Sequence, residues 1–249
     1  MKKKLVAGLC STILICGLAF AQNSTASEAG SSTYSAENAD TGTDASADAF
    51  TKAEEEFSLM LMNYFKDKNA DLVKVTVDFF RQMPLVTEDM QMPLVGFYAE
   101  VFKDKKLKEK LLSEIDSLKS KNVSQFFHSV ADFDFDSFCK KPDVNPNVND
   151  LFWGAFFASG KTKYLDIIID VAVSFHGEKE DLVKFLAGDS ACWSLASNAQ
   201  QYKEVREYLE KSRKKGEAVI DYILNTDPDE IRVNTVFFLQ EQKKAGVWQ

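Results

Sequence analysis

One octapeptide of this 249-residue chain satisfies most of the pattern of a phosphate-binding loop. Residues 155–162 read AFFASGKT, with an alanine in place of the first glycine and a helical pattern directly afterwards. Such a loop needs small residues because its backbone amides must wrap the phosphate oxygens, whereas Phe156 and Phe157 occupy the middle here. We therefore interpret Gly160 as the left-handed residue that ends a helix, place Lys161 on a surface turn, and expect no nucleotide binding.

A second candidate is the acidic run DFDFD at 132–136, which resembles the start of a calcium loop. Asp143 falls at the twelfth position of that loop, so oxygens stand at positions 1, 3, 5 and 12, as a hard cation prefers. Against this, Ser137 replaces the turn glycine, and Phe133 and Phe135 occupy positions that are normally solvated. We expect an acidic turn with inward-facing phenyl rings, and the sequence leaves weak calcium association open.

The remaining residues that could do chemistry are the two histidines and the last two of the four cysteines. His128 and His176 each stand near apolar residues without a second ligand nearby, so we expect both to be structural. Cys139 and Cys192 form a candidate disulfide in an oxidising compartment, although Cys192 beside a tryptophan also fits a small buried core residue. The sequence predicts no catalytic, cofactor-binding or metal-ligating residue, and hence no enzyme.

The first residues have the pattern of an export signal. Three lysines precede an apolar run over 5–20, which ends in the cleavage-type tripeptide Ala-Phe-Ala. This predicts a signal peptide over 1–21 and a protein that is periplasmic or secreted. Cys10 and Cys16 lie within the run, but large residues precede them where lipid attachment needs a small one, so a lipoprotein is less favoured. The run is also too short for a stable membrane span.

Composition changes sharply after the signal peptide. Residues 22–50 are rich in Ser, Thr, Ala and acids and contain no Lys or Arg, so they bury too little apolar surface to offset the entropy of ordering. We expect a disordered, acidic spacer over 22–50 and one folded domain over 51–249. The formal net charge of −8 and the sequence pI near 5.0 argue against a nucleic-acid partner.

The folded domain has helical periodicity nearly throughout. Apolar residues recur at spacing 3-1-3-1 from Phe57 to Phe65, and another such stripe runs from Leu107 to Leu118. Residues 73–79 alternate like a strand, but no partner strand follows, and Asn69 or Asp71 could cap a helix there. We predict an all-α fold of short antiparallel helix hairpins, arranged as a single α-solenoid-like or bundle domain.

Two apolar stretches of the domain look alike. Residues 94–99 read LVGFYA and residues 151–158 read LFWGAFFA, and each is followed by a basic turn and another helix. This pattern of aromatics, glycine and a following helix resembles degenerate helical repeats of the tetratricopeptide or HEAT kind. The resemblance covers about a quarter of the chain, and it implies a role in binding a partner.

These observations favour an exported, non-catalytic helical binding or scaffold protein whose partner is a protein or peptide of the cell envelope. They predict no nucleic-acid partner, no nucleotide and no stable membrane span. The alternative is a periplasmic carrier of an apolar small molecule, supported by a content of 20 phenylalanines. A hydrolase has the least support. The sequence leaves open the identity of the ligand and the oligomeric state.

Overall fold

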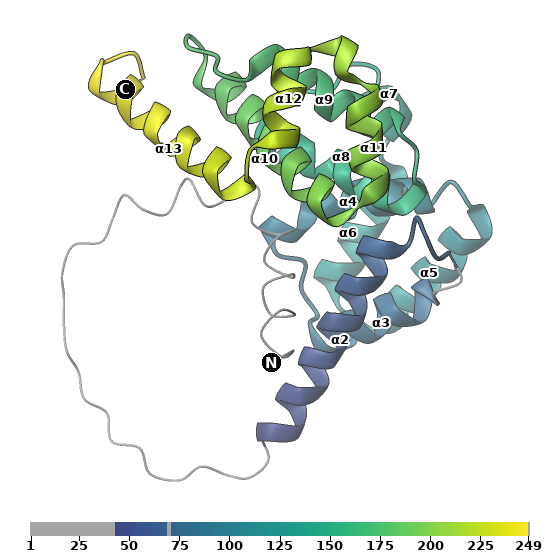
Figure 1. Cartoon of the computed structure of the whole chain (residues 1–249). Helices are drawn as coiled ribbons and strands as arrows, with labels where there is room; N and C mark the ends of the chain where they lie inside the picture. The colour runs from purple at the N-terminus through teal and green to yellow at the C-terminus, as the bar shows by residue number, and fades with distance from the viewer. Residues whose placement is uncertain (1–42, 69–70, 249) are drawn as a thin grey trace, which may run out of the picture.

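The computed structural model describes residues 43–68 and 71–248, and this part of the chain is helical without a β-strand (Figure 1). The predicted all-α fold is thus confirmed, and it is compatible with a bundle or a solenoid. The predicted signal peptide and residues 22–42 of the predicted spacer lie outside the described residues.

The helices are α2 (Thr43–Asn63), α3 (Leu72–Gln82), α4 (Glu88–Val101), α5 (Lys105–Ser117), α6 (Lys121–Asp132), α7 (Phe135–Phe138), α8 (Pro146–Ser159), α9 (Lys163–Phe175), α10 (Leu182–Gln201), α11 (Lys203–Lys211), α12 (Glu217–Asn225) and α13 (Pro228–Lys244), with a 3-10 turn at Arg213–Lys215.

The N-terminal boundary of the helical domain differs from the prediction. α2 begins at Thr43, so residues 43–50, which we expected to be disordered spacer, are helical. Phe50 lies seven residues before Phe57 and packs against the core, which extends the apolar stripe of α2 backwards by two turns. Acidic residues suit the first turns of a helix, so the composition that indicated a spacer also fits a helix N-terminus.

Side-chain caps mark where several helices begin. Asp71 accepts a hydrogen bond from the backbone amide of Lys74, which confirms the helix over the strand-like residues 73–79. Asn145 caps the start of α8 by accepting a hydrogen bond from the Val148 amide. The same helix ends at Gly160, which has the left-handed conformation with φ 70°. The predicted role of Gly160 as a helix-ending residue is confirmed.

The most extensive contact between two helices joins α4 and α8, which carry the two look-alike stretches. A β-carbon on Gly96 would lie 1.8 Å from the carbonyl oxygen of Leu151. Reciprocally, a β-carbon on Gly154 would lie 1.9 Å from the carbonyl oxygen of Pro93. The two backbones therefore touch directly, and only glycine fits at either position.

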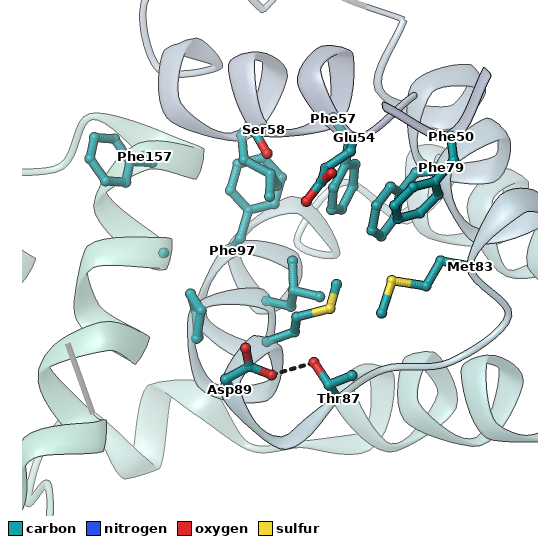
Figure 2. A pocket seen from close by; sticks show the side chains of 15 residues that line it. Phe50, Glu54, Phe57, Ser58, Phe79, Met83, Thr87, Asp89, Phe97 and Phe157 are labelled. Atoms are coloured by element: carbon teal, nitrogen blue, oxygen red, sulfur yellow. Dashed lines mark hydrogen bonds between the residues drawn. The ribbon is translucent and has the colours of Figure 1, made fainter. Parts of the chain in front are cut away.

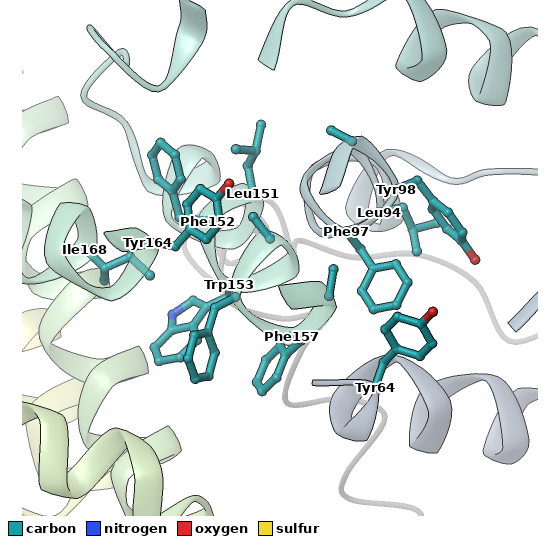
Figure 3. Close-up of a cluster of buried hydrophobic side chains, with 14 of the residues drawn as sticks. Tyr64, Leu94, Phe97, Tyr98, Leu151, Phe152, Trp153, Phe157, Tyr164 and Ile168 are labelled. Atoms are coloured by element: carbon teal, nitrogen blue, oxygen red, sulfur yellow. The ribbon is translucent and has the colours of Figure 1, made fainter. Parts of the chain in front are cut away.

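Aromatic side chains surround this crossing and form the core (Figure 3). Tyr64 of α2 meets Phe97 of α4 with ring centroids 5.6 Å apart. On the other side of the crossing, the indole Nε1 of Trp153 donates to Ser194 Oγ of α10 at 3.0 Å. The buried position expected for Trp153 is confirmed, since only 5% of the residue is exposed.

The C-terminal half is arranged around α10. This helix packs against α8, α9, α11, α12 and α13, while α13 projects away from the other helices at one end of the molecule (Figure 1). Thr235 of α13 donates to Asp189 of α10 at 3.0 Å, and Phe238 meets Phe185 at 4.8 Å between ring centroids. Across 43–68 and 71–248, no helix combines the length and the apolar character needed to cross a membrane.

Candidate ligand-binding site

A cavity of about 300 Å³ lies between α2, α3 and α4 and is bounded on one side by α8 (Figure 2). One face of α2 forms the first wall, because residues 50, 54, 57, 58 and 61 recur at helical spacing. Opposite it, α4 contributes Met90, Leu94 and Phe97, which share a face at spacing 4 and 3. The complete lining is Phe50, Glu54, Phe57, Ser58, Leu61, Phe79, Met83, Thr87, Asp89, Met90, Pro93, Leu94, Phe97, Gly154 and Phe157.

The walls are mostly apolar and aromatic. Phe57 stacks on Phe79 with ring centroids 4.2 Å apart and an interplanar angle of 5°, which fixes α2 against α3. Both rings are almost fully buried, whereas Phe50 and Met83 are only half-buried. Methionine is flexible and polarizable, so Met83 and Met90 can adapt the cavity to different shapes. The arrangement suits an apolar guest of modest size.

The charged groups of the lining are both acids. Glu54 is half-buried on α2, and no described residue donates a hydrogen bond to it or pairs with it. Asp89 stands on the opposite side of the cavity, where it accepts a hydrogen bond from Thr87 Oγ1 (Figure 2). The described lining contains no Lys, Arg or His. The cavity therefore combines aromatic walls with a half-buried carboxylate at Glu54 and an exposed carboxylate at Asp89.

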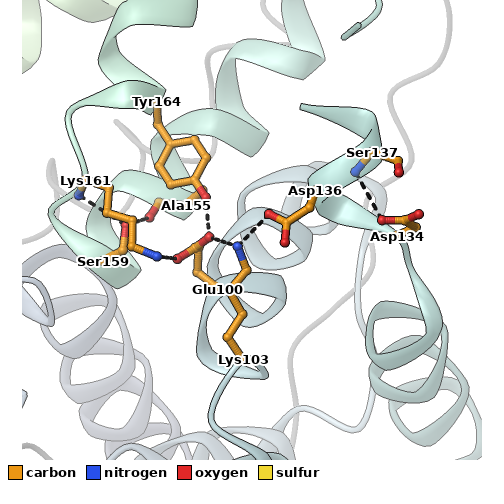
Figure 4. A network of polar contacts seen from close by, with 9 residues as sticks. All are labelled: Glu100, Lys103, Asp134, Asp136, Ser137, Ala155, Ser159, Lys161 and Tyr164. Atoms are coloured by element: carbon orange, nitrogen blue, oxygen red, sulfur yellow. Dashed lines mark hydrogen bonds and ion pairs between the residues drawn. The ribbon is translucent and has the colours of Figure 1, made fainter. Parts of the chain in front are cut away.

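A second acid on an apolar face, Glu100, lies farther along α4, and unlike Glu54 it receives several donors (Figure 4). The Glu100 side chain is only 2% exposed and receives Lys103 Nζ at 2.5 Å and Lys161 Nζ at 2.7 Å. Tyr164 donates its hydroxyl to the same carboxylate, and Lys103 continues to Asp136 at 2.8 Å. We call these five residues the Glu100 network.

The electrostatics of the Glu100 network follow from these donors. Burial alone would raise the pKa of the Glu100 carboxyl. The hydrogen bonds from Lys103, Lys161 and Tyr164 together outweigh burial and hold that pKa below its ordinary value. Every oxygen of this carboxylate is occupied from within the fold, so the network is a structural joint between α4, α7 and α9.

The phosphate-loop pattern at 155–162 belongs to this joint. Residues 155–159 are the last turn and a half of α8, not a loop, and Phe156 and Phe157 are buried in the core. Lys161 lies on an exposed turn as predicted, but its ammonium group also binds the buried Glu100, which the sequence did not indicate. The Gly160 amide donates to the Phe156 carbonyl and the Lys161 amide donates to Ser159 Oγ, so neither is directed at a phosphate site.

The acidic run at 132–136 is used for capping and for the Glu100 network. Asp134 caps α7 by accepting from the Ser137 amide at 3.1 Å, and Asp136 pairs with Lys103. Phe135 is buried as expected, whereas Phe133 is 37% exposed, which contradicts its inward packing. In the part of the chain that the structure describes, no group of three His, Cys, Asp or Glu residues could hold a metal ion.

The two histidines occupy different environments. His128 is exposed and lies 3.1 Å from Asp116. His176 Nδ1 is 2.8 Å from Oδ1 of the buried Asp189, and its ring stacks on Tyr222 at 4.8 Å. The other Asp189 oxygen accepts from Thr235, so this acid joins the end of α9 to α13.

The two cysteines of the folded domain are free thiols, so the candidate disulfide between Cys139 and Cys192 is not formed. Cys192 is fully buried in α10, as its position beside a tryptophan had indicated. Burial raises the pKa of both thiols, which keeps them protonated and poor nucleophiles.

Sequence reasoning did not single out Glu54, Asp89 or Glu100. A signal for Glu54 exists: it stands between Phe50 and Phe57 at spacing 4 and 3, on the apolar face of α2. Glu100 is likewise an isolated acid within the apolar run from Leu94 to Phe102. An acid on an apolar stripe faces either a partner inside the fold or a cavity.

Three comparisons with known proteins add no relative: no protein-family model, no curated protein and no solved structure matches this chain. The class of protein is therefore defined by fold and site alone. It is an all-helical protein with an acidic, aromatic-walled cavity.

Proposed function

We propose that this protein is a non-catalytic binding protein that holds a small apolar molecule in the cavity between α2, α3, α4 and α8. The observation that carries the proposal is the cavity itself, about 300 Å³ of space whose walls are mostly aromatic side chains and methionines. The space opens to solvent on one side, where the exposed Asp89 and the half-buried Phe50 border it, so a guest can enter without unfolding the core.

The chemistry of the lining supports binding over catalysis. The described walls offer two carboxylates and no histidine, cysteine or lysine that could act beside them as a nucleophile or base. The predicted signal peptide over 1–21 completes the proposal, because it directs the protein to the periplasm or the medium. The function is thus that of an exported carrier.

Saturable binding of a neutral apolar fluorophore tests the proposal. We expect N-phenyl-1-naphthylamine to bind the purified protein with a blue-shifted, enhanced emission. Leu61→Trp, on the cavity wall, should fill the space and weaken binding at least tenfold. Leu59→Trp is the matched control, because Leu59 is 52% exposed on the same helix and does not line the cavity. Equal binding by both variants, or no saturable binding at all, would contradict the proposal.

One observation favours a second candidate function, the binding of a protein or peptide of the cell envelope. Val233, Val236 and Phe237 form an exposed apolar face at spacing 3 and 1 on the projecting helix α13, and Phe237 is 63% exposed. If this face docks on a partner, Phe237→Ser should abolish crosslinking to that partner in envelope extract, while Arg232→Ser on the same helix should not. Crosslinking unaffected by Phe237→Ser would dismiss this candidate.

A further inference from the structure

The cavity carries more information than its volume, because its two charged residues have the same sign and come from opposite walls. Glu54 reaches into the space from α2, and Asp89 faces it from the first turn of α4 (Figure 2). The basic residues of α2 and α3 pair with other acids. Lys52 pairs with Glu56 at 3.9 Å, Lys74 pairs with Asp78 at 2.5 Å, and Arg81 pairs with Asp78 as well. No cation of the described fold neutralises the cavity.

A half-buried carboxylate without a partner has a cost. Its charge is partly removed from water, and no described side chain donates to it in return. The Glu100 network shows that this fold can bring two lysines and a tyrosine to one carboxylate. At Glu54 no described residue supplies such a positive charge, so a bound ligand is the group that could supply it.

The aromatic walls point to the same kind of guest. Phe50, Phe57, Phe79, Phe97 and Phe157 all border the cavity. The face of a phenyl ring carries partial negative charge, and it attracts an ammonium group placed within about 6 Å. Carboxylates and phenyl rings together form the environment in which proteins hold organic cations, whereas an anionic guest such as a fatty acid would be repelled by both.

From this juxtaposition we infer that the cavity selects a cationic amphiphile, a molecule with an apolar body and a protonated or quaternary amine. The apolar body fills the space between Phe57, Leu94 and Phe97, and the ammonium group faces Glu54, with Asp89 adding to the field from the opposite side. This inference rests on the proposed function, since it names the class of ligand for the same cavity.

Three adamantane probes of nearly equal size and different charge test the inference on the full chain. We expect 1-aminoadamantane to bind about tenfold more tightly than neutral 1-adamantanol, and adamantane-1-carboxylate to bind more weakly than either. Isothermal titration calorimetry or displacement of N-phenyl-1-naphthylamine measures all three. Raising the salt concentration should reduce the difference in affinity between the amine and the alcohol, because part of the preference for the amine is Coulombic.

Variants assign the preference to its residue. Glu54→Gln should remove most of the preference for the amine while leaving 1-adamantanol binding within about twofold, and Asp89→Asn should remove a smaller part. Glu55→Gln is the matched control, because it deletes the same charge at the next position of α2, where the side chain is exposed and outside the lining.

The outcomes separate the two proposals. Saturable binding of 1-adamantanol with no preference for the amine overturns the cationic ligand and leaves the apolar carrier standing. Binding of none of the probes, including N-phenyl-1-naphthylamine, overturns both. A preference that survives Glu54→Gln and Asp89→Asn together also overturns the inference, because the charge that selects the amine would then lie elsewhere.

Discussion

Glu54 and Glu100 are both acids on apolar helix faces, yet the fold treats them in opposite ways. Glu100 is buried and receives donors from Lys103, Lys161 and Tyr164. Glu54 is half-buried at the wall of a cavity, and no described residue donates to it. The same residue type therefore joins helices in one region and, in our proposal, faces a ligand in the other. Helix α4 links the two regions, because Met90 near its N-terminal end lines the cavity and Glu100 lies near its C-terminal end.

Substitutions at the crossing of α4 and α8, which supports both regions, should lower the free energy of unfolding the most. Gly96→Ala and Gly154→Ala should each cost about 4 kcal/mol or more, because the new methyl group would overlap a backbone carbonyl that cannot move aside. Urea unfolding monitored by circular dichroism measures the loss. Gly246→Ala is the control: its φ of 72° carries some strain, but no atom lies within 4 Å of the added carbon, so about 1 kcal/mol is expected. Equal losses at all three positions would disprove the close crossing.

Removing the acid of the Glu100 network comes next. Glu100→Ala should lower the free energy of unfolding by about 3 kcal/mol, because the buried Tyr164 hydroxyl loses its acceptor and two ammonium groups lose theirs. The same urea titration measures it, with Glu109→Ala on the exposed side of α5 as a control near zero. A loss below about 1 kcal/mol would show that Glu100 does not stabilise the fold in the way we infer from its donors.

The pH dependence of stability should also distinguish the two acids. The pKa of Glu100 lies below its ordinary value of 4.5 in the folded protein, so its contribution is complete above that value and disappears as the pH falls through the folded pKa. Unfolding titrations between about pH 7 and pH 3 should show wild type losing stability relative to Glu100→Gln. A constant difference between these two proteins over the whole interval would contradict the prediction.

A smaller effect is expected at Lys161. Lys161→Ala should cost about 1 kcal/mol, because its ammonium group is half-exposed and Lys103 and Tyr164 still hold Glu100. In Glu100→Ala the same lysine substitution should cost almost nothing, which a double-mutant cycle measures. A thermal stabilisation by Mg-ATP that Lys161→Ala abolishes would instead restore the phosphate-loop interpretation.

The smallest effect on stability is expected at the acid of the cavity. Glu54→Gln should change the free energy of unfolding by less than about 0.5 kcal/mol, because no described partner is lost. The midpoint of the urea transition measures this. A destabilisation comparable to that of Glu100→Ala would erase the contrast between the two regions.

Local rules predicted much of the fold. Gly160 and the Asp71 cap were readable because helix ends depend on one or two residues and their immediate neighbours. The burial of Trp153 followed from a helix that is apolar nearly all round. The start of α2 was misplaced because composition alone does not distinguish a disordered acidic segment from an acidic helix N-terminus that packs through Phe50.

The site was harder to predict because it depends on distances across the fold. Glu100 and Lys161 are far apart in the sequence, and nothing in the local pattern of either residue indicates the other. The direction of Glu54 depends on where α3 and α4 lie relative to α2, and the space between them follows from how these helices pack. A single sequence shows that an acid interrupts an apolar face, but not what it meets there.

The glycine-to-glycine contact of α4 and α8 also has a consequence for the rate of folding. Most helical proteins fold quickly because their main contacts join neighbours in sequence, whereas the main contact here joins segments about 60 residues apart. The chain between α4 and α8 must close into a loop before the two glycines can meet, and the entropy lost in closing it is not offset until the backbones are in contact. We therefore expect the pairing of the look-alike stretches 94–99 and 151–158 to make this protein fold more slowly than a helical bundle whose main contacts are local.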